Sequence, residues 1–584
     1  MIHYPYLQEQ PSSRRTVDVF RGLNRNQRIG EGEFCDMQNL TSDYYPVLSP
    51  RLSRGRKEQT VSPEGMCYVP GTGTFMIDDG KLTFIDADGH LHPEAEEEGS
   101  FRREAIHSFA LMGKSLIIAP EMKCIDIDAP TVVRSIDETW SVMIGTVKVA
   151  MCDCDGKVYE NVVESPNAPT NVGNLALWLD SSRVPRVLMQ YTALTAEWTA
   201  IPTVYVKITG LGEHRFEAGD GVEISGLDGI AHDLNDSHVI QRVGHGEIVI
   251  IGTVDETYEQ DCAAMPIHIE RRVPELNFLV EAGNRLWGCK RDVNEIYASK
   301  LGDFRNWNVF SGLSTDSWVG NVGSSGVFTG AVNHGGYPVF YKETVKHKVW
   351  PSSTGAHQIT SVPCTGVRLG CEGSVTTCGG SVLYVAQDGV YQDDGSGEVR
   401  ISQPLGVWNY TRGCGTVHAD KYYLSLDRAN TKRELLVYDL RRKLWHREDG
   451  SEFVAFASAR ERLYAAERNG CLFDLTGSRG TPEGKVLWSA TTGDLMLSAP
   501  DHQYISRLTL RLSLEPESRL DIYARYDHED RWVKLGTAYG RKPGSFTLPV
   551  RPRRCDHLQL KLEGQGMGKI YSITQTLEKG SELS

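Results

Sequence analysis

The stretch Val382-Leu383-Tyr384-Val385-Ala386-Gln387-Asp388-Gly389-Val390-Tyr391 carries the pattern that decides the fold. Apolar residues run toward an Asp-Gly pair and resume directly after it. Asp-Gly between two apolar runs is a strong hairpin signal, because the tight turn of a hairpin needs positive φ at its central residues. The stretch therefore predicts two short antiparallel strands.

The same strand–turn–strand pattern returns on both sides of this stretch. It occurs at Thr74–Ile85, where Asp88-Gly89 then turns the chain again, at Lys421–Trp445, and at Arg462–Leu475 around Asn469-Gly470. Hairpins that recur at such spacing, each ending near an aromatic residue, are typical of β-propeller blades. Neither a G-H…W-D nor a kelch signature recurs, so we expect an irregular propeller of undefined blade number.

Two regions depart from this spacing. Strands of a separate small barrel or sandwich are predicted at Val204–Thr209, Gly219–Ile224, His238–Val243 and Glu247–Ile251. After Trp488 about six regular strands are predicted at Arg507–Leu514, Arg519–Tyr526, Trp532–Leu535, Ser545–Val550, His557–Glu563 and Lys569–Thr576. Alternation in Leu508-Leu510-Leu512-Leu514 and in Leu558-Leu560-Leu562 indicates one buried and one solvated face, as in a β-sandwich.

The expected fold is therefore all-β, an irregular β-propeller platform with an inserted small β-domain and a C-terminal β-sandwich. We assign residues 1–166 to an N-terminal segment and the first blades, 167–272 to the inserted domain, 273–488 to the remaining blades and 489–584 to the sandwich. A chain of 584 residues and 65.0 kDa is long enough for two to four such domains.

Charge and hydropathy narrow the function class. The formal net charge of −14 argues against a protein that grips nucleic acid through a basic surface, although it suits a passage through which DNA slides. Four cations between Arg51 and Lys57 could form a local basic patch, but a solvated loop is the favoured interpretation. No apolar run is long enough for a membrane helix, and residues 1–11 lack signal-peptide character, so folding in a cytoplasm is expected.

Reactive motifs are absent from the sequence. The thirteen cysteines lack zinc-type spacing and are expected to be reduced and mostly buried. The acid pairs Asp86/Asp88, Asp126/Asp128 and Asp153/Asp155 fit hairpin turns better than calcium loops. No G-x-S-x-G, H-E-x-x-H or Walker-type loop occurs. We therefore predict no catalytic, cofactor-binding or metal residues, no cofactor, and a protein that is not an enzyme.

Three stretches resemble one family of virion proteins. They are Phe20–Asn24 with Gly32–Arg51, then Asn284–Cys289 with Asn294–Ser299, Asp303–Trp307 and Phe340–Glu343, and finally Arg551–His557 through residue 581. Together they resemble the tail nozzle (tail tubular protein B) and head-to-tail stabilisation proteins of short-tailed bacteriophages. The opening stretch contains the apolar residues Met37, Leu40, Tyr44, Tyr45 and Val47. It either starts the propeller, as the family resemblance implies, or is an ordinary first blade without a special function.

The resemblance implies a mechanical role. In such a family the chain is a ring-forming subunit, with six copies as the implied number, that extends the DNA channel below the portal and adaptor and anchors fibres or a plug. The implied partners are portal, adaptor and tail fibre or plug proteins, with transient non-specific passage of DNA and no membrane insertion. The implied location is the virion tail, assembled in the host cytoplasm.

Two alternatives stay open. One is a receptor- or carbohydrate-binding tail protein, which should group exposed aromatic residues on one face of the sandwich. The other is a propeller hydrolase of cell-surface glycans, which should place two carboxylates roughly 5–10 Å apart at the floor of a pocket. Trp287, Tyr297 and Trp307 are expected in blade cores rather than in a ligand platform.

Overall fold

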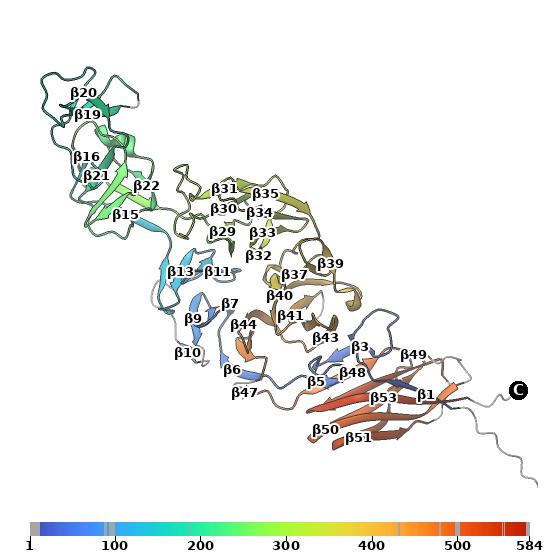
Figure 1. Ribbon diagram of the computed structural model, residues 1–584. Helices are drawn as coiled ribbons and strands as arrows, with labels where there is room; N and C mark the ends of the chain where they lie inside the picture. The colour runs from blue at the N-terminus through green and yellow to red at the C-terminus, as the bar shows by residue number, and fades with distance from the viewer. Residues whose placement is uncertain are drawn as a thin grey trace, which may run out of the picture.

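A computed structural model describes residues 12–86, 90–92, 100–184, 186–429, 433–477, 480–496, 503–551, 553 and 555–579 (Figure 1). The predicted all-β class is confirmed, because helix in these residues is limited to three 3₁₀ segments. These are η1 (Gly229–Leu234), η2 (Glu372–Ser374) and η3 (Gln403–Leu405). Within the same ranges, no helix is both long and apolar enough to cross a lipid bilayer.

Seven small antiparallel sheets in the described residues form the propeller. The blades begin with β7 (Pro63–Val69), β8 (Gly73–Asp78), β9 (Lys81–Asp86) and β10 (Leu91–His92), then β11 (Ser108–Met112), β12 (Ser115–Ala119), β13 (Lys123–Asp126) and β14 (Val133–Ser135). After the insert follow β28 (Phe278–Glu281), β29 (Leu286–Cys289), β30 (Glu295–Ala298) and β31 (Trp318–Asn321), then β32 (Phe328–His334), β33 (Tyr337–Lys342), β34 (Val345–Trp350) and β35 (Gln358–Pro363). The last three are β36 (Thr376–Cys378), β37 (Ser381–Val385), β38 (Val390–Asp393) and β39 (Glu398–Arg400); β40 (Tyr410–His418), β41 (Lys421–Arg428), β42 (Glu434–Asp439) and β43 (Leu444–Arg447); and β44 (Phe453–Ser458), β45 (Leu463–Glu467) and β46 (Cys471–Asp474).

The ring is closed by a strand from far earlier in the chain. The innermost strands touch in the order β7, β11, β28, β32, β36, β40 and β44, and β44 touches β7 again. The outer side of the last blade is completed by β6 (Gly55–Gln59), which pairs antiparallel with β46 and with β47 (Thr481–Pro482). The last blade is therefore assembled from both ends of the propeller, which leaves no open seam.

Hydrophobic cores lie between neighbouring blades rather than within them. Phe75 and Ile118 share one core between the first two blades, and Trp287 and Phe328 share another between the third and fourth. The deciding stretch forms β37 and β38, joined through Asp388-Gly389, and its Tyr384 packs against Tyr341 of the preceding blade. The hairpins at residues 74–85, 421–445 and 462–475 also form, whereas Asp88-Gly89 lies outside the described residues.

The insert consists of three sheets between β14 and β28. They contain β15 (Glu138–Val142), β27 (Ile267–Arg271), β22 (Gly221–Ser225) and β23 (Ser237–Val239); β24 (Arg242–Gly244), β25 (Glu247–Ile251), β21 (Tyr205–Thr209), β16 (Thr146–Cys152) and β26 (Tyr258–Asp261); and β17 (Val163–Ser165), β18 (Leu177–Asp180), β19 (Val187–Thr192) and β20 (Glu197–Ala200). Its first strand starts at Glu138, earlier than the predicted boundary at 167.

One predicted strand of the insert is two strands. The chain leaves one sheet after Val239 and enters the next at Arg242, so His238–Val243 is divided between β23 and β24. Buried Ile240 lies at the switch, where its N–H donates to the carbonyl of Asp220 and its carbonyl accepts from the N–H of Gly219. Alternating apolar residues thus continue through a change of sheet, which periodicity alone does not reveal.

A buried polar cluster fixes the insert to the third blade. Arg271 pairs with Asp220 at 2.5 Å, and the Asn306 amide donates to Asp220 Oδ1 at 3.1 Å. The Gly221 N–H donates to Asn306 Oδ1 at 2.9 Å. Asn306 belongs to Asp303–Trp307, so this stretch of the family resemblance has a structural task in the chain: it holds the insert.

The sandwich is one strongly bent sheet of nine strands. It contains β1 (Ser13–Val17), β2 (Gly22–Leu23), β3 (Glu33–Gln38), β48 (Leu487–Thr492), β49 (Leu495–Met496), β50 (Gln503–Tyr526), β51 (Val533–Pro549), β52 (His557–Gln565) and β53 (Gly568–Lys579). The first four of the six predicted strands merge into β50 and β51, because the pair bends at an irregularity without ending. Between Leu514↔Arg541 and Arg519↔Tyr539, four residues of β50 oppose one residue of β51.

The opening stretch belongs to the sandwich and not to the first blade. β1 pairs with β53, and β3 pairs with β48. Met37 and Leu40 are fully buried in a core shared by the sandwich and the fifth and sixth blades, whereas Tyr44 and Tyr45 are partly exposed. A short pair of strands, β4 (Leu40–Thr41) and β5 (Ser49–Pro50), then leads to β6. The stretch therefore forms no part of a first blade, and of residues 1–166 the opening segment belongs to the sandwich, with the first blades following from β7.

Arg51 and Arg54 are buried, so neither a solvated loop nor a basic patch describes them. Arg54 is 2% exposed and pairs with Glu448 at 2.6 Å and Asp449 at 2.8 Å. Arg51 pairs with Glu483 and reaches Glu448 at 3.5 Å. Burial disfavours the charge of Asp449, but Arg54 holds the pKa of this carboxyl below its ordinary value. We call these five residues the joint cluster, because they connect the opening stretch, the end of the sixth blade and the linker to the sandwich.

All thirteen cysteines are free. Six are buried, six are intermediate and Cys154 is exposed. Burial raises the pKa of Cys67, Cys371 and Cys414 to about 12, so these thiols stay protonated near neutral pH.

Replacing Arg54 with alanine is expected to lower the free energy of unfolding by about 3–5 kcal/mol, because Glu448 and Asp449 would keep buried charges without their cation. Urea unfolding followed by tryptophan fluorescence measures this. Arg102→Ala is the matched control, since Arg102 forms an exposed ion pair with Glu275 that contributes little. An Arg54→Ala midpoint equal to that of the wild type would contradict the structural role of the joint cluster.

Stability is expected to fall between pH 7 and pH 5 through three propeller histidines. Burial, reinforced by a nearby cation in each case, lowers the pKa of His446 to about 3 and of His347 and His357 to about 4. The unfolded chain binds these protons below about pH 6.5 while the folded chain does not, so each histidine removes about 1.4 kcal/mol per pH unit.

Urea midpoints at several pH values test this dependence. His446→Gln should flatten the slope by about one proton. An unchanged slope in His446→Gln would disprove the assignment.

Candidate functional site

The propeller has a central cavity that could hold a ligand. It has a volume of about 930 Å³ and is lined from every blade. Small residues on the inner strands, among them Gly65, Gly330, Gly413, Gly415 and Ala455, leave this space open. A propeller whose inner strands carried larger side chains would fill it.

Two carboxylates on the cavity wall have structural partners. Glu372, with its side chain 2% exposed, pairs with Arg291 at 2.7 Å. Glu64 accepts hydrogen bonds from the N–H groups of Gly80 and Glu104. Arg433, on the sixth blade, pairs with Asp427 and donates to the carbonyl of Phe453 on the last blade. The charged groups of this wall therefore brace the blades against one another.

The sandwich carries aromatic side chains on one outward face. Tyr523 of β50 lies directly opposite Lys534 of β51 and Lys561 of β52. Trp532, just before β51, is only partly buried, and Tyr539 is 65% exposed. We call Tyr523, Trp532, Tyr539 and the polar residues Arg519, Asp521, Arg525, Lys534, Lys561 and Glu563 between them the aromatic face.

Cations lie against the rings of this face. The Arg525 guanidinium is 4.9 Å from the Trp532 ring centroid, and the Lys561 ammonium is 5.8 Å from it. Lys534 Nζ is 5.9 Å from the Tyr523 ring. Cation–π contacts of this kind hold the rings in place and keep polar donors beside them.

The carboxylate of Asp521 organises the centre of the face. Lys534 reaches it at 2.7 Å, Arg519 at 2.6 Å and Thr537 Oγ1 at 2.6 Å. Partial burial opposes its charge, but these three hydrogen bonds hold the pKa of Asp521 below its ordinary value. Four cations face two carboxylates, Asp521 and Glu563, so the face is net positive on a chain of net charge −14.

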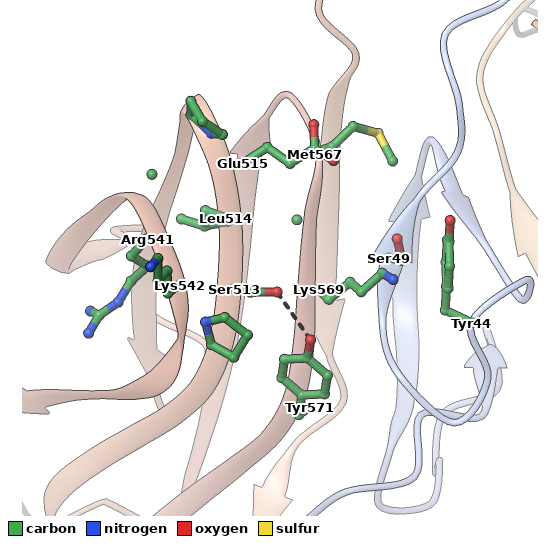
Figure 2. Close-up of a pocket in the computed structure, with 14 residues that line it drawn as sticks. Tyr44, Ser49, Ser513, Leu514, Glu515, Arg541, Lys542, Met567, Lys569 and Tyr571 are labelled. Carbon is green, nitrogen blue, oxygen red and sulfur yellow. Dashed lines mark hydrogen bonds between the residues drawn. The ribbon is translucent and has the colours of Figure 1, made fainter.

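A pocket of about 630 Å³ opens where β50 and β51 bend, next to the opening stretch (Figure 2). Its wall carries Arg541, Lys542 and Lys569 with one carboxylate, Glu515. The Lys569 ammonium lies 3.7 Å from the Tyr44 ring centroid, and Ser513 and Tyr571 share a hydrogen bond of 3.2 Å. The pocket follows Tyr539 along β51 and repeats the combination of cations with aromatic rings.

The acid pairs named from the sequence lie in turns. Asp126 accepts from the N–H of Asp128, and Asp153 accepts from the N–H groups of Asp155 and Lys157, as capping residues of hairpin turns do. Asp88 lies outside the described residues. Trp287 and Trp307 are buried in blade cores, as expected.

The aromatic face itself was missed at the sequence level. Trp532 and Tyr523 were recognised as strand residues, but their common face depends on the register between β50, β51 and β52. The only available signal was alternation in β50, which places Arg519, Asp521, Tyr523 and Arg525 opposite the buried Leu520, Ile522 and Ala524.

No protein-family model and no curated protein matches the chain. Among solved structures it is similar to virginiamycin B lyase from Staphylococcus aureus, at 8% identity and a TM-score of 0.31, over 72% of this chain and 96% of that one. BamB from Moraxella catarrhalis matches at 11% identity and a TM-score of 0.31, over 73% and 97%. An exo-β-1,3-galactanase from Phanerochaete chrysosporium matches at 9% identity and a TM-score of 0.19, over 51% and 94%. The likeness extends no further than the all-β fold class.

The prediction that the chain is not an enzyme was wrong. Solved structures similar to it include a lyase and a galactanase. The absence of a sequence motif is by itself no ground for excluding catalysis. The resemblance to phage tail proteins is not tested by these comparisons and stays a prediction.

Proposed function

We propose that the chain is a carbohydrate-binding protein in which the propeller is the platform and the aromatic face of the sandwich takes up the ligand. The observation that carries the proposal is the grouping of Tyr523, Trp532 and Tyr539 on one outward face beside charged hydrogen-bonding groups. Aromatic rings pack against the apolar face of a sugar, while charged side chains bind its hydroxyl groups.

The charge of the face selects the class of carbohydrate. Arg519, Arg525, Lys534 and Lys561 outnumber Asp521 and Glu563, so acidic sugars are attracted and a neutral polymer is not. Because the chain as a whole is acidic, with a net charge of −14, attraction of a polyanion depends on cation-rich surfaces such as this face.

Affinity electrophoresis and calorimetry with polygalacturonate, and with dextran as the neutral polymer, test the proposal. Trp532→Ala is expected to weaken binding to polygalacturonate at least tenfold, about 1.4 kcal/mol or more, because aromatic side chains that become buried in a complex dominate its binding energy. The matched control is Trp350→Ala, which removes a 40% exposed tryptophan that packs against Tyr337 and Lys348 on the fourth blade. Equal binding by the Trp532→Ala and Trp350→Ala variants would reject the aromatic face as the site.

The arrangement of modules favours a second candidate, a subunit of a phage tail nozzle or head-to-tail stabilisation ring. The insert and the sandwich lie on opposite sides of the propeller, which gives an elongated subunit (Figure 1). Two of the stretches that resemble this family lie at joints between modules: Asp303–Trp307 at the insert and residues 32–51 between sandwich and propeller. Stretches at joints preserve the relative placement of modules, which a ring subunit requires.

Light scattering and electron microscopy of the purified chain, alone and with portal–adaptor complexes, test this second candidate. The expected result is a ring of several copies on the complex, and a ring that forms only on the complex also agrees with it. A chain that stays monomeric and never joins a portal–adaptor complex would count against the tail assignment.

A further inference from the structure

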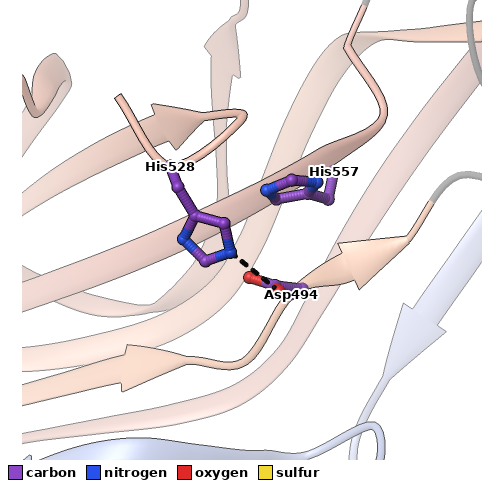
Figure 3. Close-up of side chains that lie close together, drawn as sticks. All are labelled: Asp494, His528 and His557. Carbon is purple, nitrogen blue, oxygen red and sulfur yellow. Dashed lines mark hydrogen bonds and ion pairs between the residues drawn. The ribbon is translucent and has the colours of Figure 1, made fainter. Parts of the chain in front are cut away.

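Three segments of the sandwich bring together two histidines and a carboxylate. Asp494 lies in the loop between β48 and β49, His528 in the turn between β50 and β51, and His557 at the start of β52 (Figure 3). One potential ligand atom of each lies within 4.8 Å of the other two. Successive members of this set lie about 30 residues apart along the chain, so no short sequence motif predicts the cluster.

The geometry of the pair Asp494–His528 is already close to that of metal ligands. Asp494 Oδ2 and His528 Nε2 are 3.1 Å apart, and the rings of His528 and His557 have centroids 4.4 Å apart. Zinc bonds of about 2.1 Å place tetrahedral ligands roughly 3.4 Å apart, so one edge is formed and the others close by a small rotation of exposed side chains.

His557 has one unsatisfied ring nitrogen and a carboxylate near the other. Its Nε2 is buried and has no hydrogen-bond partner, which is costly unless another group uses the lone pair. Its Nδ1 lies 3.8 Å from Asp527 Oδ1, and that oxygen is held by the N–H groups of Asp556 at 2.9 Å and His557 at 3.2 Å. This separation is longer than a hydrogen bond, but it places the carboxylate on the side of the ring from which a metal-ligating imidazole is usually supported.

We propose that Asp494, His528 and His557 bind a divalent transition-metal ion of the zinc class, with Asp527 as the positioning residue for His557. Two imidazole nitrogens and one carboxylate suit Zn²⁺, and the fourth position is left to water. The ion links the ends of β48, β50 and β52, so it stabilises the edge of the sandwich. The site is separate from the aromatic face, and its test does not depend on carbohydrate binding.

Calorimetry with Zn²⁺ and visible absorption with Co²⁺ test the site on untagged full-length protein. We expect one ion per chain, a tetrahedral Co²⁺ spectrum and a rise in Tm of about 5 °C with Zn²⁺ in hundredfold excess over Kd, reversed by EDTA. His528→Gln and Asp494→Asn should each weaken binding at least a hundredfold, and Asp527→Asn about 10–100-fold.

His232→Gln is the control, because His232 lies beside Asp233 in the insert with its side chain 73% exposed. It should leave the Zn²⁺ affinity and the Co²⁺ spectrum unchanged. Circular dichroism confirms that each variant folds. No stoichiometric binding by the wild type, or unchanged affinity in both His528→Gln and Asp494→Asn, overturns the proposal.

Discussion

Closure of the propeller ring is the constraint on which the rest of the structure depends. Every blade buries its faces against two neighbours, so an unclosed ring would expose the apolar surfaces of Met66, Met76 and Leu472 between the last blade and the first. β6 supplies the closing strand, and it can do so only because residues 12–54 are held in the sandwich and by the joint cluster. Closure and attachment of the sandwich are therefore one event.

Local chemistry made the blades predictable, whereas long-range pairing did not. Asp388-Gly389 and Asn469-Gly470 define their hairpins from a few neighbouring residues, and both hairpins form. The roles of Arg54 and β6 depend on partners about 400 residues away, so cations in a row were interpreted as a solvated loop. The division of His238–Val243 between two sheets was missed for the same reason, because the alternation of apolar residues is the same in both sheets.

The aromatic face and the histidine cluster depend on different kinds of long-range contact, and neither kind can be predicted from sequence spacing. The aromatic face follows from strand register, which places Tyr523 between Lys534 and Lys561 although each lies on a different strand. The cluster of Asp494, His528 and His557 follows from the meeting of three loop ends. In the aromatic face the strands themselves carry the functional side chains, whereas in the histidine cluster the strands fix the positions of the turns that carry them.

The shared last blade also has a consequence for synthesis of the protein. A ribosome delivers β6 long before β46, and β1 to β3 long before β48 and β53. The nascent chain must therefore keep β1, β3 and β6 without their later partner strands while six complete blades and the insert emerge, with contacts of very high sequence separation still to form. The ring and the sandwich are therefore completed late, once β46, β48 and β53 have been synthesised, and not blade by blade. A chain cut between sandwich and propeller, on either side of the propeller, would leave both pieces without a partner strand.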